Sequence, residues 1–306
     1  MAGYGFLFPG QGSQQPGMGK DFLDKHALAR QLFDEANSVL GFDLKRLCLE
    51  GPEDRLALTY HAQPAILAVS TIAHRLFAAR APVQPLSLAG HSLGEYSALV
   101  AAGAIPFAKA VHGVHLRGKA MQEATPVGMG AMAAILGADA AELEAICREE
   151  SRGQVVVPAN YNCAGQIVIS GHAEAVDRVL TRVKGKRLTV SAPFHSPLMA
   201  PAAEAMAPVI AALPWSDAAA PVCANASNRF LAKAAEFPPS LLEQITAPVR
   251  WDSGVQAMIA GGVSAVIEFG HGKVLAGLMK RIDKSVAAIN VMDDESLGAA
   301  LARAGA

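Results

Sequence analysis

The chain of 306 residues contains few cysteines, few aromatic residues and few charged residues. Its four cysteines are far apart and form no Cys-x-x-Cys pair: Cys48, Cys147, Cys163 and Cys223. This spacing argues against a disulfide framework and against a zinc site. We therefore expect reduced cysteines in the core of a cytoplasmic protein, and no bound metal.

The sequence also lacks long apolar runs and an excess of positive charge. No run reaches the roughly 20 apolar residues that a membrane-spanning helix needs. The first residues carry no basic segment and are interrupted at Pro9, which is unlike a signal peptide. Lysine and arginine (26) nearly balance aspartate and glutamate (27). These features indicate neither a membrane partner nor a nucleic-acid partner.

Hydrophobic residues, by contrast, are abundant. They make up 52% of the chain and charged residues only 17%, which predicts a large buried core. Short apolar runs that read as buried strands alternate with helical patterns. The strands are expected at 5–8, 86–89, 264–269 and 287–291, and the helices at 20–40, 63–79, 93–102, 106–123 and 274–281. This alternation predicts an α/β fold with a mostly parallel sheet covered on both faces.

The middle of the chain follows another pattern. Strands are expected at 131–136, 155–161, 166–170 and 187–191, and helices at 140–150 and 173–183. The resulting order, strand-helix-strand-strand-helix-strand, is that of a ferredoxin-like unit. We predict a small ferredoxin-like insert at 127–191 within a hydrolase-like core formed by 1–126 and 192–306.

A candidate nucleophile lies between an expected strand and an expected helix. Gly90-His91-Ser92-Leu93-Gly94 fits Gly-x-Ser-x-Gly, a sharp turn that exposes its serine at the start of a helix. The backbone N–H groups and the partial positive charge of the helix start can stabilise an oxyanion there. The alternative is an N-cap serine whose neighbouring glycines serve only the turn.

A serine hydroxyl needs a base, and His195 is the candidate among nine histidines. It lies in Ala192-Pro-Phe-His-Ser-Pro197, where two prolines stiffen the backbone. The side chain of His91 should point away from Ser92, because neighbouring residues diverge at a turn, and His112 and His115 are expected to be solvated. A structural histidine at a helix start remains the alternative for His195.

Arg117 interrupts an apolar helix face. Phe107, Ala110, Val114, Arg117 and Met121 share that face by their spacing of three and four residues. A buried guanidinium without an anionic partner is costly. Two partners stay open: an internal Asp or Glu, or a substrate carboxylate bound by the planar fork.

These segments, with others along the chain, resemble one known family, that of the malonyl-CoA:acyl carrier protein transacylases and the related acyltransferase domains of fatty-acid and polyketide synthases. The matching segments, in order, are Phe8-Pro-Gly-Gln-Gly-Ser-Gln14, Gln63-Pro64-Ala65, Gly90-His-Ser-Leu-Gly-Glu-Tyr96, Leu116-Arg-Gly-Lys119, Met121-Gln122, Ala159-Asn-Tyr-Asn162, Gly165-Gln166, Phe194-His195-Ser196, Gln244, Pro248-Val249, Trp251 and Gly272-Lys273-Val274-Leu275. They extend over nearly the whole chain at the spacing of the family.

The resemblance implies roles for individual residues. Ser92 corresponds to the nucleophile and His195 to its general base. Gln11 and Leu93 correspond to the two backbone N–H donors of the oxyanion hole. Gln244 corresponds to the residue whose backbone carbonyl orients the histidine, so that no acidic third member is expected.

The resemblance also implies which acyl group is chosen. Arg117 would pair with the free carboxylate of malonate, so an acetyl group would leave it unpaired. Phe194 and Leu93 resemble the residues of malonyl-selecting relatives, in which bulk near the α-carbon disfavours a branching methyl. That second selection is worth only about 1–3 kcal/mol.

The implied activity is transfer of malonyl from malonyl-CoA to the phosphopantetheine thiol of acyl carrier protein. The mechanism would be ping-pong through an ester on Ser92, and the product would serve fatty-acid biosynthesis. Malonyl-CoA is a substrate, no bound cofactor is expected, and the enzyme should act as a monomer in the cytoplasm. The alternatives are a free-standing acyltransferase of a polyketide synthase or a malonate-decarboxylase system, a serine thioesterase, and a non-catalytic carrier-binding module.

Two further features stay open. Gly270-His271-Gly272-Lys273 carries a histidine where relatives usually have a proline, and is either a phosphate-binding loop or a turn that tolerates the change. A basic stretch in the insert could contribute to docking of an acidic carrier protein or could be an ordinary solvated face. It comprises Arg178, Arg182, Lys184, Lys186 and Arg187.

Overall fold

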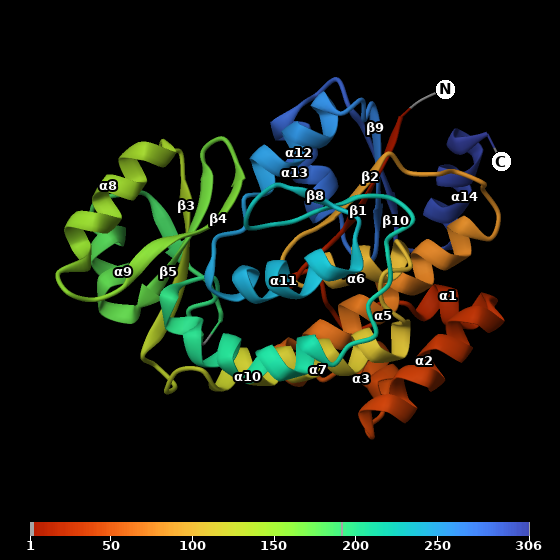
Figure 1. The fold of residues 1–306 in the computed structure, drawn as a ribbon, viewed down its shortest axis with the longest axis horizontal. Coiled ribbons are helices and arrows are strands. Elements are labelled where there is room, and N and C mark those ends of the chain that lie inside the picture. Colours follow the sequence, from red (N-terminus) through yellow and green to blue (C-terminus); the bar gives the residue numbers. More distant parts are fainter. Residues whose placement is uncertain (1–2, 191, 306) are drawn as a thin grey trace.

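The computed structural model describes residues 3–190 and 192–305 and contains two β-sheets (Figure 1). The larger sheet has the strand order β10-β9-β1-β2-β7-β8. Its strands are β1 (Tyr4–Phe8), β2 (Ser87–Gly90), β7 (Val222–Cys223), β8 (Phe230–Leu231), β9 (Ala265–Phe269) and β10 (Ala287–Val291). All neighbouring pairs are parallel except β7 with β8. The expected mostly parallel α/β sheet is confirmed.

Helices surround this sheet on both faces. Before and after β2 they are α1 (Lys20–Lys25), α2 (Ala27–Leu40), α3 (Leu44–Glu50), α4 (Glu53–Ala57), α5 (Thr59–Ala78), α6 (Gly94–Ala101) and α7 (Phe107–Glu123). In the last third they are α10 (Ala200–Ala211), α11 (Phe237–Thr246), α12 (Trp251–Ala260), α13 (Val274–Ile282) and α14 (Asp294–Ala304), with short 3-10 turns at Pro197–Met199 and Ala234–Glu236.

The central strand β1 shows how the sheet is covered. Its side chains alternate between the two faces, as the period of a strand requires. Phe6 and Phe8 belong to the core cluster that also contains side chains of α5, whereas Leu7 belongs to a second cluster formed with α12 and α13. Because both faces of the strand are buried, the sequence shows a continuous apolar run instead of an alternating one.

The smaller sheet is antiparallel, with the order β4-β5-β3-β6, and forms the left part of Figure 1. Its elements are β3 (Gly130–Leu136), α8 (Ala140–Ser151), β4 (Val156–Cys163), β5 (Gln166–His172), α9 (Ala173–Leu180) and β6 (Gly185–Arg187). Numbered within the unit, the strand order is 2-3-1-4, which agrees with the expected ferredoxin-like pattern.

The last strand of this unit lies earlier in the chain than the sequence predicts. It was expected at 187–191, but β6 spans Gly185–Arg187 and pairs with Ala133–Ile135 of β3. The apolar residues Leu188 and Val190 suggested a strand, yet Leu188 is 38% exposed. Ser191, the expected end of the strand, lies outside the described residues. The expected helix at 173–183 is also shorter, because α9 ends at Leu180.

Helix α5 begins earlier than expected and runs through Pro64. A proline inside a helix cannot donate to the carbonyl four residues before it, here that of Tyr60. A ring nitrogen of His115 lies 2.8 Å from this carbonyl oxygen and takes the place of the missing donor. His115 was expected to be solvated, and this contact between α5 and α7 corrects that expectation.

The two sheets meet along β4. The N–H of Val249 donates to the carbonyl of Ala159, and the N–H of Tyr161 donates to the carbonyl of Val249 (2.8 and 2.9 Å). The guanidinium of Arg250 lies over the Tyr161 ring at 5.6 Å. The smaller sheet is therefore joined to the segment between α11 and α12, which lies beside the site described next. Within the described ranges, none of the helices combines the length and the apolarity needed to cross a bilayer.

Candidate active site

Ser92 lies at the turn between β2 and α6, at the carboxyl end of a central parallel strand. Its φ is +50°, a left-handed backbone conformation that is strained for a residue other than glycine. The N–H of Ser92 donates to Asn225 Oδ1 (2.7 Å), and Asn225 Nδ2 donates to the carbonyl of Gly90 (2.7 Å). Asn225 therefore holds the strained turn from both sides.

The glycines of the turn are required by close backbone contacts. A Cβ on Gly94 would lie 2.1 Å from the carbonyl oxygen of Phe8, and one on Gly90 would lie 1.8 Å from the carbonyl of Gly94. No side chain fits at either position. The turn can therefore pack directly against the end of β1 and present Ser92 there.

His195 is placed to act on this serine. Its Nε2 lies 2.7 Å from Ser92 Oγ, and its Nδ1 lies 2.9 Å from the backbone carbonyl oxygen of Gln244 on α11. Because a carbonyl only accepts, Nδ1 carries the proton and Nε2 can accept the proton of Ser92. Burial and the positive charge of Arg117 lower the pKa of His195 to about 3, so the ring is neutral at neutral pH. Its φ of +55° shows that the loop holds it in a strained conformation.

Arg117 is 1% exposed and points to the same serine. Its Nη1 donates to Gln63 Oε1 (2.9 Å), and its Nη2 donates to Gln244 Oε1 (2.8 Å) and Ser92 Oγ (3.3 Å). All three acceptors are uncharged, and among the described residues the Nε has no partner. The helix face thus turns Arg117 inward as expected, but its hydrogen-bond partners include no carboxylate. This arrangement favours the substrate carboxylate over an internal acid.

Gln11 and Leu93 lie in neighbouring loops. β1 and β2 are parallel, and Phe8 lies opposite Gly90. Gln11 comes three positions after Phe8, and Leu93 comes three positions after Gly90. Leu93 is buried, and the Gln11 side chain donates weakly to Thr59 Oγ1 (3.5 Å). The topology places both backbones at the edge of the sheet where Ser92 lies. This is where parallel α/β sheets bind their ligands.

Phe194 is 7% exposed and belongs to the main core cluster, directly before His195. His91 points away from Ser92, as expected, and its Nε2 lies 2.9 Å from Asn162 Oδ1 of β4. His91, the residue after β2, thus connects the turn that holds Ser92 to the smaller sheet.

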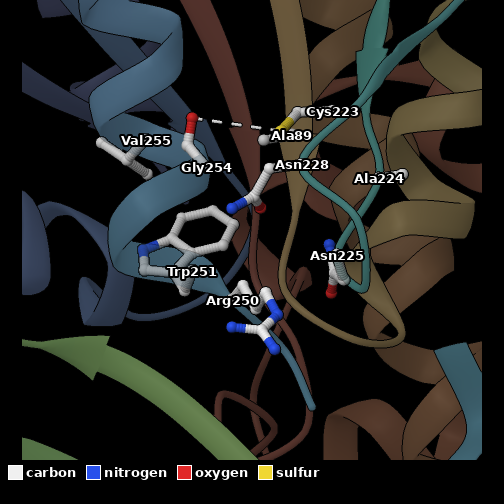
Figure 2. Close-up of a pocket in the computed structure, with 9 residues that line it drawn as sticks. All are labelled: Ala89, Cys223, Ala224, Asn225, Asn228, Arg250, Trp251, Gly254 and Val255. Atoms are coloured by element: carbon white, nitrogen blue, oxygen red, sulfur yellow. Dashed lines mark hydrogen bonds between the residues drawn. The ribbon is translucent and has the colours of Figure 1, made fainter. Parts of the chain in front are cut away.

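A small cavity lies behind the turn (Figure 2). Trp251, Gly254 and Val255 of α12 line one side, and Cys223, Ala224, Asn225 and Asn228 line the other. Its volume is about 10 Å³, no more than the space one water molecule needs. An acyl group therefore does not fit there, and the cavity belongs to the packing behind Asn225.

The Gly270–Lys273 loop provides no free anion site at the start of α13. The N–H groups of Leu275 and Ala276 donate to the buried carboxylate of Glu268 (3.1 and 2.8 Å). Asn290 Nδ2 donates to the carbonyls of Gly270 and Gly272. An internal carboxylate already uses the donors that a phosphate would need, which favours a simple turn that tolerates His271. In residues 3–190 and 192–305, no cluster of three or more His, Cys, Asp or Glu could hold a metal ion.

The basic stretch of the smaller unit is largely engaged with its own neighbours. Arg178 donates to the carbonyls of Glu150 and Ser151, and Arg187 forms an ion pair with Asp177 (2.6 Å). Arg182 forms ion pairs with Glu149 and Glu150. These contacts engage the three arginines of the stretch internally, which favours an ordinary solvated face.

Three buried residues that had no assigned role complete the site: Gln63, Glu95 and Asn225. Gln63 and Glu95 stand in segments that resemble the family, but neither spacing nor periodicity indicated their contacts. Asn225 is 133 residues from the serine it holds and follows a strand of two residues. No local pattern marks such a position.

The acyl transferase domain model matches residues 5–299 of the chain. The malonyl CoA-acyl carrier protein transacylase of Bacillus subtilis (strain 168) is 45% identical, over 98% of this chain and 97% of that protein. The protein of the same name from Escherichia coli (strain K12) is 43% identical, over 98% and 99%. The solved transacylase of Coxiella burnetii is 41% identical with a TM-score of 0.97, over 99% and 98%. A malonyl-transacylase solved with a type II polyketide synthase acyl-carrier protein is 41% identical with a TM-score of 0.96, over 99% and 100%.

Proposed function

The chain belongs to the acyl transferase family, and on this premise we propose that it moves malonyl from malonyl-CoA to the phosphopantetheine thiol of an acyl carrier protein. The malonyl group would be carried as an ester on Ser92. One observation supports this most strongly. Ser92 Oγ lies 2.7 Å from the base nitrogen of His195 and 3.3 Å from Arg117 Nη2, so nucleophile, base and cation meet at one atom.

In the first half-reaction Ser92 Oγ attacks the thioester carbonyl while His195 Nε2 takes the serine proton. The backbone N–H groups of Gln11 and Leu93 stabilise the oxyanion of the tetrahedral intermediate. The carbon–sulfur bond then breaks, and the proton on His195 passes to the sulfur of coenzyme A, which leaves as a thiol. The malonyl group remains as an ester on Ser92.

The second half-reaction reverses these steps with another thiol. His195 takes the proton of the phosphopantetheine thiol, whose sulfur attacks the ester carbonyl. Collapse of the intermediate returns the proton to Ser92 and releases the malonyl carrier protein. The backbone carbonyl of Gln244 keeps Nδ1 of His195 protonated in both halves, and so takes the place of an acidic third residue.

Arg117 selects the acyl group in this scheme. A malonyl ester on Ser92 carries a carboxylate that the adjacent guanidinium can bind through two parallel hydrogen bonds. An acetyl ester offers the guanidinium no carboxylate to hydrogen-bond, so its transition state is less stable. The bulk of Phe194 and Leu93 near the α-carbon adds a smaller selection against a branching methyl.

We further propose the context of this reaction. Residues 127–191 form an insert that closes one side of a site built by 1–126 and 192–306. The enzyme acts as a monomer, and the reaction requires no bound cofactor. The enzyme supplies malonyl units for fatty-acid biosynthesis in the cytoplasm. A polyketide synthase is the second candidate pathway, since one relative was solved with the carrier protein of such a synthase.

Single-turnover mass spectrometry tests the proposal. One equivalent of malonyl-CoA should give a malonyl-enzyme adduct that Ser92→Ala abolishes. Adding a carrier protein with its phosphopantetheine arm should then move malonyl to the carrier thiol at least about 100-fold faster than free malonate forms. Rapid release of malonate without the carrier would instead support the thioesterase alternative.

A further inference from the structure

Glu95 is a buried acid one helical turn after Ser92 that the proposed reaction does not use. It lies on α6 and is 2% exposed. Its Oε2 accepts from the N–H of Asn225 (3.0 Å) and from Gln244 Nε2 (2.7 Å). Burying a carboxylate is costly, so packing alone does not explain why an acid occupies this position.

Gln244 connects this acid to the malonyl-selecting arginine. Its Nε2 donates to Glu95 Oε2 and to the carbonyl of Ser92 (2.7 and 3.0 Å), while its Oε1 accepts from Arg117 Nη2 (2.8 Å). An amide has one accepting end and one donating end. Arginine can only donate and the Ser92 carbonyl can only accept, so these two partners fix the orientation of the carboxamide, and Glu95 Oε2 accepts from its donating end.

We propose that Glu95 is a positioning residue for acyl selection: through the Gln244 carboxamide it fixes the direction in which the Arg117 guanidinium faces Ser92. The inference rests on the proposed malonyl transfer and names a residue that acts through Gln244, without touching the substrate. Gln63 holds the other guanidinium nitrogen from α5. Arg117 is thus held at two nitrogens, and the carboxamide that holds one of them is held in turn by the carboxyl group of Glu95.

The network also links selection to catalysis. The backbone carbonyl of Gln244 binds His195, and its side chain binds Arg117. The other partner of Glu95, Asn225, holds the strained turn of Ser92 through its side chain. Glu95 therefore contacts both residues that position the three central side chains. Burial raises the pKa of Glu95 to about 7, while the hydrogen bonds from Asn225 and Gln244 and the charge of Arg117 oppose that rise.

A selectivity ratio separates this role from simple structural support. The quantity to measure is kcat/KM for malonyl loading divided by kcat/KM for acetyl loading. Glu95→Ala should lower the ratio at least about tenfold, because Arg117 loses its fixed direction while Ser92 and His195 still react. Glu95→Gln keeps an oxygen for the Gln244 and Asn225 donors, so its ratio should stay within about threefold of the wild-type ratio.

Glu268→Ala provides the matched control. Glu268 is also a fully buried acid whose carboxylate accepts two N–H groups, and burial raises its pKa to about 7 as well. Its partners belong to α13, however, and not to the acylation site. This variant should lower thermal stability while leaving the selectivity ratio unchanged.

Glu95→Asp extends the test if the alanine variant does not fold. It keeps the acid but shortens the side chain by one methylene, which withdraws the carboxylate from Gln244, so the ratio should again fall. A wild-type ratio in Glu95→Ala or Glu95→Asp would overturn the inference, even if both rates fell together. If the wild-type enzyme itself did not prefer malonyl, the proposed function would fail, and the two failures are thereby distinguished.

Discussion

Arg117 and the arginines of the smaller unit were both candidates for binding an acidic partner, and the structure surrounds them in opposite ways. Arg117 is buried against two carboxamide oxygens and a hydroxyl, none of them charged. Arg182 and Arg187 are exposed and form ion pairs with Glu149, Glu150 and Asp177. Arg117 thus has no carboxylate among its hydrogen-bond partners, whereas Arg182 and Arg187 are already paired with neighbouring acids.

The difference shows that burial and partners decide what an arginine can bind. An exposed ion pair in water contributes about 0–1 kcal/mol and is screened by salt. A buried guanidinium interacts with an anion across a medium of low dielectric constant and is already fixed in direction. The most basic stretch of the sequence is therefore a weaker candidate for recognition than one isolated arginine on an apolar helix face.

Of the substitutions at these arginines, Arg117→Ala should have the largest effect. Malonyl loading of Ser92 should fall by about 100-fold or more in kcat/KM, because the substrate carboxylate loses its cation in a buried site. Acetyl loading should fall by less than about tenfold or rise, since an acetyl group has no free carboxylate to pair with the guanidinium. Stopped-flow or quenched-flow loading assays with each thioester provide both numbers.

Equal losses for the two acyl groups would contradict this difference between the arginines, because they would make Arg117 a general structural residue. Arg117→Lys separates the charge of the side chain from its shape. A lysine keeps the charge but not the planar fork, so its malonyl loading should lie between those of the wild-type and alanine enzymes.

The smallest predicted effect is that of Arg187→Ala. Loss of one exposed ion pair should change the free energy of unfolding by less than about 1 kcal/mol. The KM for the carrier protein should stay within about twofold, because Asp177 already neutralises this arginine. Denaturant unfolding and steady-state transfer assays measure the two quantities. A KM raised fivefold or more would show that the face docks the carrier despite its internal ion pairs.

Sequence patterns predicted those parts of the fold that are determined by residues close together in the chain. The apolar run at 5–8 and the glycines around Ser92 each determine their local structure, and β1 and the exposed turn follow from them. The helical spacing of apolar residues in α7 correctly predicted that Arg117 points inward. These predictions rest on spacing within a single element.

Features that depend on distant contacts were missed. The helix period cannot show that Gln63 and Gln244 hold Arg117 from 54 and 127 positions away. β6 was misplaced because its three residues are all exposed, and only pairing with β3 makes them a strand. Helix α5 begins before Pro64, and the Tyr60 carbonyl that Pro64 leaves without a donor is bound by His115, 55 positions away.

The central claim is that Ser92 carries malonyl in preference to uncharged acyl groups. The most direct test offers the enzyme equal concentrations of malonyl-CoA and acetyl-CoA for a few seconds and quantifies the acylated peptide that contains Ser92 by mass spectrometry. The account predicts at least about tenfold more malonyl than acetyl on Ser92. Equal occupancy, acetyl in excess, or malonyl on another residue would contradict it.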